Sequence, residues 1–458
     1  MRIKLDIPIT VYEICKITNA KSVNSIDPQG YITAISTDSR ECRENDLFIA
    51  LDGANQSGES YVNDAKSKKC IVLSAQTRSD IIQVNDTIEA LLQISKLYKS
   101  KLSIKQTIAV TGSVGKSTTV RFLSKILESR FKVHAPRGNF NNHIGVPLTV
   151  LSAPKSTEVL VLELGMNHFN EISQLSKCVA PDVGIITSIG TAHIGNLGSR
   201  ENIAKAKLEI THGMKDGTLL LPFDEPLLAD VNGAFFVSRN SSLSDFSLND
   251  NPGETYDLIS PYGNINGISF FSPQEHLLSN LSFALSASQV LGLKEHEIIK
   301  GVKTITESDL RQRFIQLKDF TVFDDSYNAS IESIMADLRY VASLHNPFSA
   351  FLGDILELGS SAEYIHEEIG RVAAGFELNN LYLYGKYSEY IARGAINAGM
   401  SPSQVFINTD ISSREVSIKQ IQSNHVSGEI ILFKASHMLR LDQIADQLAE
   451  EERMNNER

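Results

Sequence analysis

Apolar runs alternate with helical patterns over the middle of this chain. Strand-like runs occur at Thr107–Val110, Val159–Leu164 and Val183–Thr187, and polar residues follow each of them. Between the first two runs, the segment Val120–Phe131 carries apolar residues at helical spacing. This alternation predicts a parallel sheet covered by helices, with ligands bound at the carboxyl ends of the strands.

The pattern changes on both sides of this region. Residues 252–273 alternate apolar and polar positions around GNING, which predicts a hairpin, and helical spacing resumes at His276–Leu291. Before the central region, the pattern predicts strands at Asp46–Leu51 and Cys70–Leu73 and a helix at Asp86–Tyr98. After Arg311 a second strand–helix series begins, with strands predicted at Thr321–Phe323, Ser349–Leu352, Leu381–Tyr384, Val405–Ile407 and Ile430–Phe433.

These changes predict an α/β protein of three domains. We expect a small N-terminal α/β domain over residues 1–103 and a central P-loop ATPase-type domain with a parallel sheet over residues 104–310. A Rossmann-like doubly wound domain should follow over residues 311–458. The length of 458 residues agrees, because one domain usually takes roughly 100 to 200 residues.

The stretch TIAVTGSVGKSTT, residues 107–119, predicts a strand, a phosphate-binding loop and a helix. Glycines let successive amides turn towards one anion, and the helix N-terminus adds its dipole. Lys116 supplies a charge for the outer phosphates, and Ser117 a hydroxyl for Mg²⁺. Val110 stands where the usual pattern has its first glycine, so this loop is a shortened variant. A plain Gly/Ser turn is the alternative. The predicted ATP-binding residues here are Gly112, Ser113, Val114, Gly115, Lys116, Ser117 and Thr118.

Other candidates lie after the neighbouring strands. Glu163 closes the second run, where a carboxylate beside a phosphate loop suits a magnesium ion, although a lone Glu at a strand end is more often a solvated charge. His193 follows the third run in a Gly-rich loop, and alone it would more often be a structural histidine. The asparagines of Gly138–Pro147 fit turn chemistry alone. His276 and Asn280 share a helix face without a second histidine pair, so no zinc site is predicted.

Composition narrows the class of protein. The chain is 42% hydrophobic and 21% charged, as in soluble globular proteins, and no apolar run approaches the roughly 18 residues of a membrane span. A net charge of −11 without a long basic run argues against nucleic acid as a partner. The start MRIKLDIPITVYEI lacks the apolar core of a secretion signal, so we expect a cytoplasmic protein. The four cysteines form no CxxC pair and should be reduced.

Nine motifs, in a fixed order from end to end, make the chain similar to the Mur ligase family. They are STDSR with NDLFIALDGA, TGSVGKSTT, GNFNNHIGVPLTVL, LELGMN, TSIGTAHIGNLGS, AKAKLEI, HLLSN, FDDSYNAS and LGDILELG. The last of them, with His366 downstream, resembles the members that add D-alanyl-D-alanine to UDP-N-acetylmuramoyl-tripeptide. The Asp-Asn-Pro-Arg motif of members that add a diamino acid is absent from the sequence.

The resemblance implies a role for each matching residue. The cofactors would be ATP and two Mg²⁺ ions, with metal ligands Ser117, Glu163, His193 and, if it is carbamylated, Lys207; an exposed helical lysine is the alternative. Asn280 would contact adenine, Asp325 the ribose and Arg313 the γ-phosphate. The implied catalytic residues are Lys116, Glu163, His193, Lys207 and Arg313. The implied substrate-binding residues are Ser39 and Arg40 on the uridine side, Asn141 and Asn142 in the central domain, and Asp354, Glu357 and His366 near the dipeptide.

The implied reaction is ATP-dependent amide formation through an acyl phosphate. ATP activates the carboxylate of the UDP-linked tripeptide, and the amine of D-alanyl-D-alanine then displaces phosphate. Because Arg313 and Asp325 lie in a different domain from the phosphate loop, we expect the site to be completed by domain closure. The expected partners are these two substrates, without nucleic acid or membrane, and the expected state is a monomer.

Two departures from the family pattern leave alternatives open. Asn328-Ala329-Ser330-Ile331 replaces Asn-Ala-Asn-Pro, and Lys434-Ala435-Ser436-His437 replaces Lys-Gly-Ser-Arg. A Mur-type ligase with another amine acceptor is therefore one alternative. A P-loop NTPase switch is another, and it would hydrolyse nucleotide without a carboxylate substrate. A binding protein with degraded catalysis is disfavoured, since Lys116, Glu163 and His193 are present.

Overall fold

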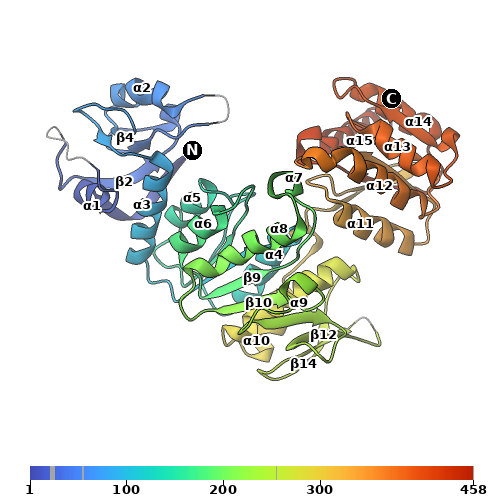
Figure 1. Cartoon of the computed structure of the whole chain (residues 1–458), viewed down its shortest axis with the longest axis horizontal. Coiled ribbons are helices and arrows are strands. Elements are labelled where there is room, and N and C mark those ends of the chain that lie inside the picture. Colours follow the sequence, from blue (N-terminus) through green and yellow to red (C-terminus); the bar gives the residue numbers. More distant parts are fainter. Residues whose placement is uncertain (21–25, 54–55, 254, 457–458) are drawn as a thin grey trace.

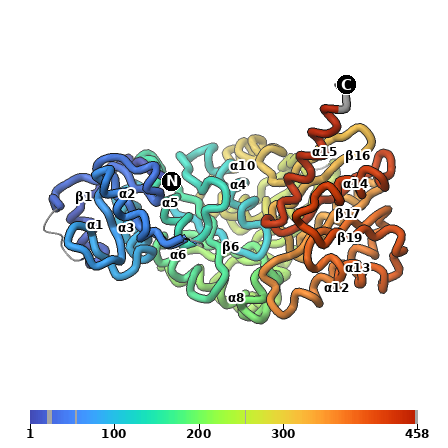
Figure 2. The backbone as a smooth tube through the Cα atoms, turned by 90° about the horizontal axis from the view of Figure 1, so that it is seen from above, coloured from blue at the N-terminus to red at the C-terminus, as the bar shows by residue number. Residues whose placement is uncertain are grey.

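The computed structural model describes residues 1–20, 26–53, 56–253 and 255–456. Three sheets follow one another along the chain, and they form three bodies, with the N-terminal and C-terminal bodies on either side of the central one (Figure 1). Seen from above, the chain runs from the blue N-terminal body to the red C-terminal body at the opposite end (Figure 2). The predicted α/β architecture is confirmed. Among the described residues, no helix has the length and apolar character that crossing a bilayer requires.

The N-terminal body contains a five-stranded sheet in the order β1-β2-β3-β4-β5, in which, among its described residues, only the β1–β2 pair is antiparallel. Its elements are β1 (Arg2–Thr10), α1 (Val11–Ile17), β2 (Tyr31–Ser36), β3 (Leu47–Ile49), α2 (Val62–Ser67), β4 (Ile71–Ser74), β5 (Ile82–Gln83) and α3 (Thr87–Lys101). Helix α3 begins where predicted, because the Asp86 carboxylate accepts hydrogen bonds from the amides of Ile88 and Glu89.

The central body holds a nine-stranded sheet in the order β14-β13-β12-β11-β10-β9-β6-β8-β7. Its elements are β6 (Gln106–Thr111), α4 (Lys116–Leu127), β7 (Val133–His134), α5 (Gly145–Leu151), β8 (Val159–Glu163), α6 (Glu171–Val179), β9 (Val183–Ile186), α7 (Ile194–Leu197), α8 (Arg200–Leu208), β10 (Thr218–Pro222), β11 (Phe235–Arg239), β12 (Phe246–Asn251), β13 (Thr255–Ile259), β14 (Ile265–Ser269), α9 (Glu275–Val290) and α10 (Glu295–Val302). The antiparallel pair β13–β14 is the predicted hairpin, of which residue 254 lies outside the described residues.

Strand β6 is buried on both faces. Ile108 and Val110 belong to the apolar core formed with α4 and α9, whereas Ala109 belongs to the opposite core with α5 and α6. A strand covered on both sides has no polar face, which explains its unbroken apolar run. Strands β8 and β9 flank β6 in parallel, so the carboxyl ends of all three meet at one edge of the sheet.

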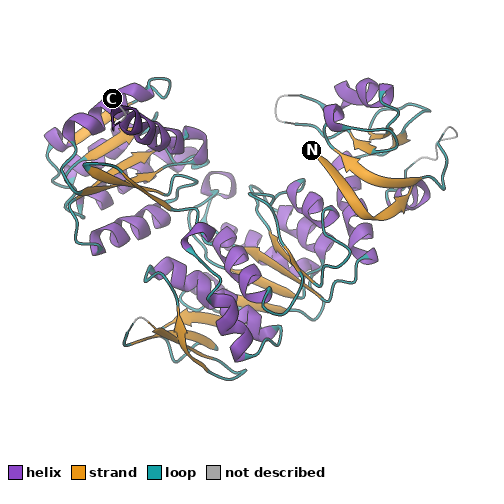
Figure 3. Ribbon diagram, turned by 180° about the vertical axis from the view of Figure 1, so that it is seen from behind, coloured by secondary structure: helices purple, strands orange, loops and turns teal. Residues whose placement is uncertain are grey.

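The C-terminal body has a six-stranded sheet in the order β15-β16-β20-β17-β18-β19, parallel except for the edge strand β15. Its elements are β15 (Arg313–Gln316), β16 (Phe320–Asp324), α11 (Ile331–Ser343), β17 (Phe348–Gly353), α12 (Ala362–Ala374), β18 (Leu381–Tyr384), α13 (Ser388–Asn397), β19 (Val405–Asn408), α14 (Arg414–Asn424), β20 (Glu429–Lys434) and α15 (Leu441–Asn456). Helices lie on both faces, with α11, α12 and α13 in one core and α14 and α15 in the other (Figure 3). The doubly wound prediction is confirmed.

Helices α12 and α13 pack closely because each presents a glycine to the other. A Cβ at Gly394 would lie 1.9 Å from the carbonyl oxygen of Glu367. We therefore expect Gly394→Ala to lower the melting temperature of the protein. The steric overlap should lower the free energy of unfolding by about 3 kcal/mol. This loss outweighs the gain of about 1 kcal/mol that alanine, compared with glycine, brings to a helix interior. Asn397→Ala, at an exposed position of the same helix, is the control. An unchanged or raised melting temperature for Gly394→Ala would contradict this packing argument.

Candidate active site

The loop between β6 and α4 is shaped by two close backbone contacts. Gly115 has φ +85°, and a Cβ there would lie 2.2 Å from the side-chain oxygen of Asn280. A Cβ at Gly112 would lie 1.9 Å from Oγ1 of Thr187. Both positions therefore require glycine, and the loop is seated against the end of β9 and against α9.

Hydrogen bonds fix the loop further. The Ser113 amide donates to the carbonyl of Ser188 at 3.0 Å, and the Ser113 hydroxyl accepts from the Gly190 amide at 2.8 Å. The Lys116 ammonium donates to the carbonyl oxygens of Gly112 at 2.7 Å and Ser113 at 3.1 Å. Burial lowers the pKa of Lys116, and the charge of Glu163 opposes that shift. The lysine is thus held at the mouth of a loop of the kind that receives phosphates.

Glu163, at the end of β8, is the acidic centre beside this loop. Its side chain is 3% exposed, and its carboxylate accepts from the Ser117 hydroxyl at 2.5 Å and from the Asn141 amide nitrogen at 2.8 Å. Asn142 also lies here, and its oxygen accepts from the amides of Ile144 and Gly145 at the start of α5. The carboxylate and hydroxyl oxygens together form a compact set of hard donors.

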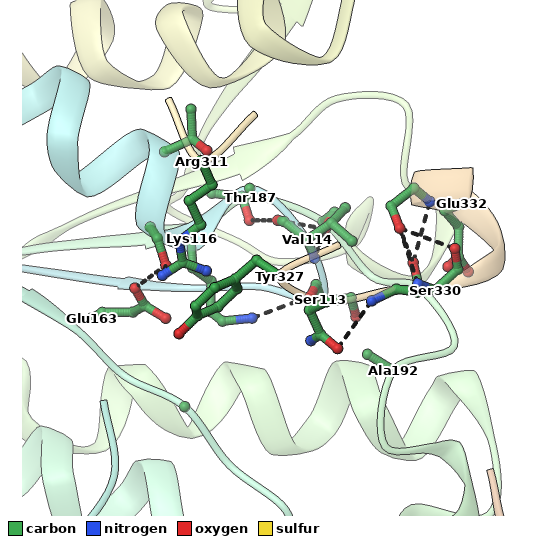
Figure 4. A pocket seen from close by; sticks show the side chains of 18 of the residues that line it. Ser113, Val114, Lys116, Glu163, Thr187, Ala192, Arg311, Tyr327, Ser330 and Glu332 are labelled. Carbon is green, nitrogen blue, oxygen red and sulfur yellow. Dashed lines mark hydrogen bonds between the residues drawn. The ribbon is translucent and has the colours of Figure 1, made fainter. Parts of the chain in front are cut away.

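A cavity of about 530 Å³ opens over these residues, with a wall from the central body and a wall from the C-terminal body. Figure 4 shows Lys116 and Glu163 on one side, with Arg311 and Tyr327 beside them and Ser330 and Glu332 farther along. The predicted residues that line it are Ser113, Val114, Gly115, Lys116, Ser117, Thr118, Asn141, Asn142, Glu163, His193, Asn280 and Asp325. The structure does not place the following predicted residues on its walls: Gly112, Lys207, Arg313, Ser39, Arg40, Asp354, Glu357 and His366.

Lys207, on α8, is buried and does not line the cavity. Its side chain is 1% exposed. Burial lowers its pKa well below the ordinary value, and the positive charge of Lys116 lowers it further. The sequence-based alternative of an exposed helical lysine does not apply to this buried side chain.

The His193 loop joins the two walls of the cavity. His193 has φ +65°, and its Nδ1 lies 2.5 Å from the carboxylate of Glu357, which belongs to the C-terminal body. The Gly195 amide donates to the Glu357 carbonyl at 3.1 Å. The hydrogen bond to His193 lowers the pKa of Glu357. The side chain of Glu357 therefore contacts the predicted metal ligand His193, although Glu357 does not line the cavity.

Asp354 and His366 use their polar atoms within the C-terminal body. The Asp354 carboxylate accepts from the amides of Lys386 and Tyr387 at 2.8 and 2.9 Å, and burial raises its pKa. His366 is fully buried, with one ring nitrogen 2.9 Å from the Ile355 amide and the other 2.6 Å from the Ala362 carbonyl oxygen. These contacts support the strand end and the neighbouring helices rather than the cavity.

Ser39 and Arg40 lie in the N-terminal body. The Asp38 carboxylate accepts from both the amide and the side chain of Arg40. The Arg40 guanidinium beside it holds the pKa of Asp38 well below its usual range. The structure therefore places these two residues apart from the phosphate loop.

Asp325, predicted at the ribose, belongs to a buried charge cluster. Lys434 forms ion pairs with Asp325 and, at 2.8 Å, with Asp337. Gln312 Nε2 lies 3.4 Å from Asp325 Oδ2 and 3.3 Å from both Asp337 Oδ1 and His276 Nε2. Burial lowers the pKa of His276 to about 4, so this ring is neutral at physiological pH.

The two arginines at the start of the C-terminal region face different ways. Arg313 pairs with Asp324 and Asp446, each at 2.7 Å, and lies away from the cavity. Arg311, which the sequence did not single out, lines the cavity and donates to the Ser117 hydroxyl at 2.7 Å. Its guanidinium carbon lies 3.6 Å from the centre of the Tyr327 ring. The sequence pattern does not distinguish Arg311 from Arg313. The structure does, because Arg311 precedes β15 whereas Arg313 is its first residue.

Comparisons with known proteins agree with this arrangement. The Mur ligase middle domain matches residues 110–287. The UDP-N-acetylmuramoyl-tripeptide–D-alanyl-D-alanine ligase of Bacillus subtilis is 34% identical over 96% of this chain and 98% of its own length. The enzyme of that name from Rickettsia prowazekii is 31% identical over 90% of this chain and 94% of its own.

Solved structures are similar along the whole chain. A crystal structure of MurF from Acinetobacter baumannii superposes with a TM-score of 0.87 at 27% identity, and the match covers 98% of this chain and 100% of that one. MurF from Thermotoga maritima, solved with ADP, has the same fold, with a TM-score of 0.77 at 24% identity over 92% of this chain and 98% of its own. The chain therefore belongs to the Mur ligase family, and the relatives that match it from end to end are UDP-N-acetylmuramoyl-tripeptide–D-alanyl-D-alanine ligases.

Proposed function

We propose that this protein uses ATP to join D-alanyl-D-alanine to UDP-N-acetylmuramoyl-tripeptide, which yields the UDP-linked pentapeptide of peptidoglycan synthesis. The observation that carries the proposal is the shared cavity, in which the phosphate loop of one body faces the loop after β16 of another. A ligase that must bring ATP, an acid and an amine together needs such a composite site. The end-to-end relatives that bear this activity in their names support the same substrates.

The chemistry explains why a phosphate site is needed. A carboxylate repels an amine and has a poor leaving group, so it must be activated before an amide can form in water. Transfer of the γ-phosphoryl group to a carboxylate oxygen gives an acyl phosphate, and the amine then attacks the acyl carbon and expels phosphate. Lys116, fixed at the loop, stabilises charge on the transferring group. Walls from two bodies would also shield the acyl phosphate from water.

Magnesium fits the donors beside the loop. Among the described residues there is no cluster of three or more His, Cys, Asp or Glu side chains suited to a metal. Mg²⁺ does not require such a cluster, because it is commonly held by one or two carboxylates, water and substrate phosphates. We propose that Ser117 and Glu163 hold one ion and that His193 contributes to a second. When bound, the ions would neutralise phosphate charge and orient the γ-phosphoryl group.

Lys207 is the proposed fourth metal-binding residue, as a carbamate. A lysine reacts with CO₂ only as the neutral amine, and burial favours that form of Lys207. The product would carry a negative charge, which the positive charge of Lys116 would stabilise.

The remaining roles divide among the proposed domains 1–103, 104–310 and 311–458. Ser39 and Arg40 are proposed to hold the uridine end, and Asn141 and Asn142 the middle of that substrate. Asn280 and Asp325 would hold adenine and ribose. Asp354, Glu357 and His366 would shape the dipeptide side, the first and last through the hydrogen bonds that they make within the body. We further propose a cytoplasmic monomer, since one chain supplies both walls of the cavity.

Phosphate release tests the function directly. The assay contains ATP, Mg²⁺, UDP-N-acetylmuramoyl-tripeptide and D-alanyl-D-alanine, and each component is omitted in turn. We expect phosphate release only in the complete mixture, with one pentapeptide product per phosphate. Equal release with other amines would favour a Mur-type ligase with another acceptor. Release without the tripeptide would favour an NTPase switch and would contradict the proposal.

We expect Lys116→Ala to abolish phosphate release while binding of the UDP-linked substrate is retained. Loss of a charge fixed at the reacting phosphoryl group should slow turnover by at least about 100-fold. The uridine end is assigned to a different body, so calorimetric titration with the UDP-tripeptide should give the wild-type affinity. Loss of both properties in a folded variant would count against this division of labour.

We expect Lys207→Ala to be inactive and to recover part of its activity when a short carboxylic acid such as formate is added. The acid would take the place of the missing carbamate beside the metal ions. Wild-type activity should also fall in CO₂-depleted buffer and return with bicarbonate. A Lys207→Ala variant with wild-type metal affinity and no rescue by formate would rule out the carbamate.

A further inference from the structure

The His193 loop, residues 188–193, is tied on one side to the phosphate loop. The Ser113 amide donates to the Ser188 carbonyl oxygen at 3.0 Å, and the Val114 amide donates to the Ser188 hydroxyl at 3.0 Å. In the opposite direction, the Gly190 amide donates to the Ser113 hydroxyl at 2.8 Å. Because three hydrogen bonds join the two loops, a displacement of the His193 loop is passed on to the phosphate loop.

The other side of the His193 loop is held by Glu332, which belongs to the C-terminal body. One carboxylate oxygen of Glu332 accepts from the Thr191 amide at 2.8 Å, and the other accepts from the Thr191 hydroxyl at 3.2 Å. Dashed lines mark hydrogen bonds at Glu332 in Figure 4. A Cβ at Gly190 would lie 2.9 Å from the first of these oxygens. The carboxylate is therefore seated directly against the backbone of the loop.

The first turn of α11 fixes the place of this carboxylate. The Ser330 hydroxyl accepts from the Ser333 amide at 3.2 Å, and the Ser330 amide donates to the Ser333 hydroxyl at 2.9 Å. This reciprocal cap stands where the family pattern has Asn-Pro, and it defines the start of the helix without the proline. Glu332 is the second residue of α11, where the helix dipole stabilises a negative charge.

We propose that Glu332 is a positioning residue for phosphoryl transfer, which fixes the His193 loop, and through it the phosphate loop, to the C-terminal body. This rests on the proposed function. Glu332 acts through Thr191 and does not touch the reacting atoms. Its two hydrogen bonds form only when the C-terminal body lies over the cavity, so they favour the arrangement in which both walls of the site are in place.

The test measures the shape and the turnover of the full-length protein. Small-angle X-ray scattering gives the radius of gyration with Mg²⁺, UDP-N-acetylmuramoyl-tripeptide and a non-hydrolysable imido analogue of ATP, and phosphate release gives kcat. Glu332→Ala removes both acceptors, whereas Glu332→Gln keeps one. Glu389→Ala is the matched control, because Glu389 is an exposed carboxylate that is also the second residue of its helix, α13.

For Glu332→Ala we expect a larger radius of gyration than for wild-type protein with the same ligands, and a kcat about 10-fold lower. The melting temperature and the affinity for ADP should be retained, because Gly112 and Gly115 still seat the phosphate loop. Glu332→Gln should recover part of kcat, and Glu389→Ala should match the wild type. A wild-type radius of gyration or a wild-type kcat for Glu332→Ala would overturn the proposal. Loss of ADP affinity would overturn it as well, since it would indicate a general structural role.

A double-mutant cycle tests whether Glu332 acts through the His193 loop. Thr191→Val removes the hydroxyl donor and keeps the amide, so kcat should fall less than in Glu332→Ala. In the double variant, Thr191→Val should have little further effect, because the partner of the hydroxyl is already absent. Additive losses would refute the route through Thr191. The radius of gyration does not depend on turnover, so a failure of wild-type protein to form pentapeptide would count against the proposed function alone.

Discussion

The close fit of a glycine-containing loop against its surroundings sets the geometry of the whole site. At Gly112 and Gly115 there is no room for a Cβ, because Thr187 and Asn280 fill that space. The loop can therefore lie against the ends of β6 and β9, and α4 starts at a fixed point beside Glu163. The cation at Lys116 and the hydroxyl at Ser117 occupy their places because the backbone is held at these contacts, not because their own side chains are rigid.

The second half of the site is held less firmly. The Glu332 carboxylate accepts from the Thr191 amide at 2.8 Å and from its hydroxyl at 3.2 Å, and Glu357 pairs with His193. Such partly exposed contacts are worth about 1 kcal/mol or less each. They orient the C-terminal body over the phosphate loop without locking it, so binding of substrates can supply the free energy that completes the site. Arg311 contacts Ser117 of the central body and the Tyr327 ring of the C-terminal body, so its position depends on how the two bodies are arranged.

Local patterns predicted the parts of the site that depend on a single stretch of chain. The order of strand, glycine loop and helix located Lys116 and Ser117, and the end of a buried apolar run located Glu163, because parallel strands end at one edge. Arg311 precedes β15 and Arg313 begins it. The sequence pattern did not predict where this strand begins, so it could not tell which arginine faces the cavity. Asp354 and His366 looked like substrate residues in their motif. Whether their polar atoms are free depends on the backbone of other segments, such as the amides of Lys386 and Tyr387.

In the buried cluster around Lys434, the pKa values of two neighbouring carboxyl groups are shifted in opposite directions. Burial raises the pKa of both acids. At Asp325 the charge and hydrogen bond of Lys434, together with the hydrogen bond to Asp337, outweigh burial and lower the pKa, whereas at Asp337 the pKa stays raised well above its ordinary value. A single cation can neutralise only one buried carboxylate, so the second keeps its proton. Asp325 thus remains a hydrogen-bond acceptor on the wall of the cavity. The linker before β15 is attached to both bodies. Gln312 donates to the cluster around Lys434 in the C-terminal body, and the Asp309 carbonyl oxygen accepts from Arg121 of α4 in the central body. Arg311 lies on the short segment between these two attachments. A rotation of the C-terminal body relative to the central body would therefore move the Arg311 guanidinium relative to the phosphate loop.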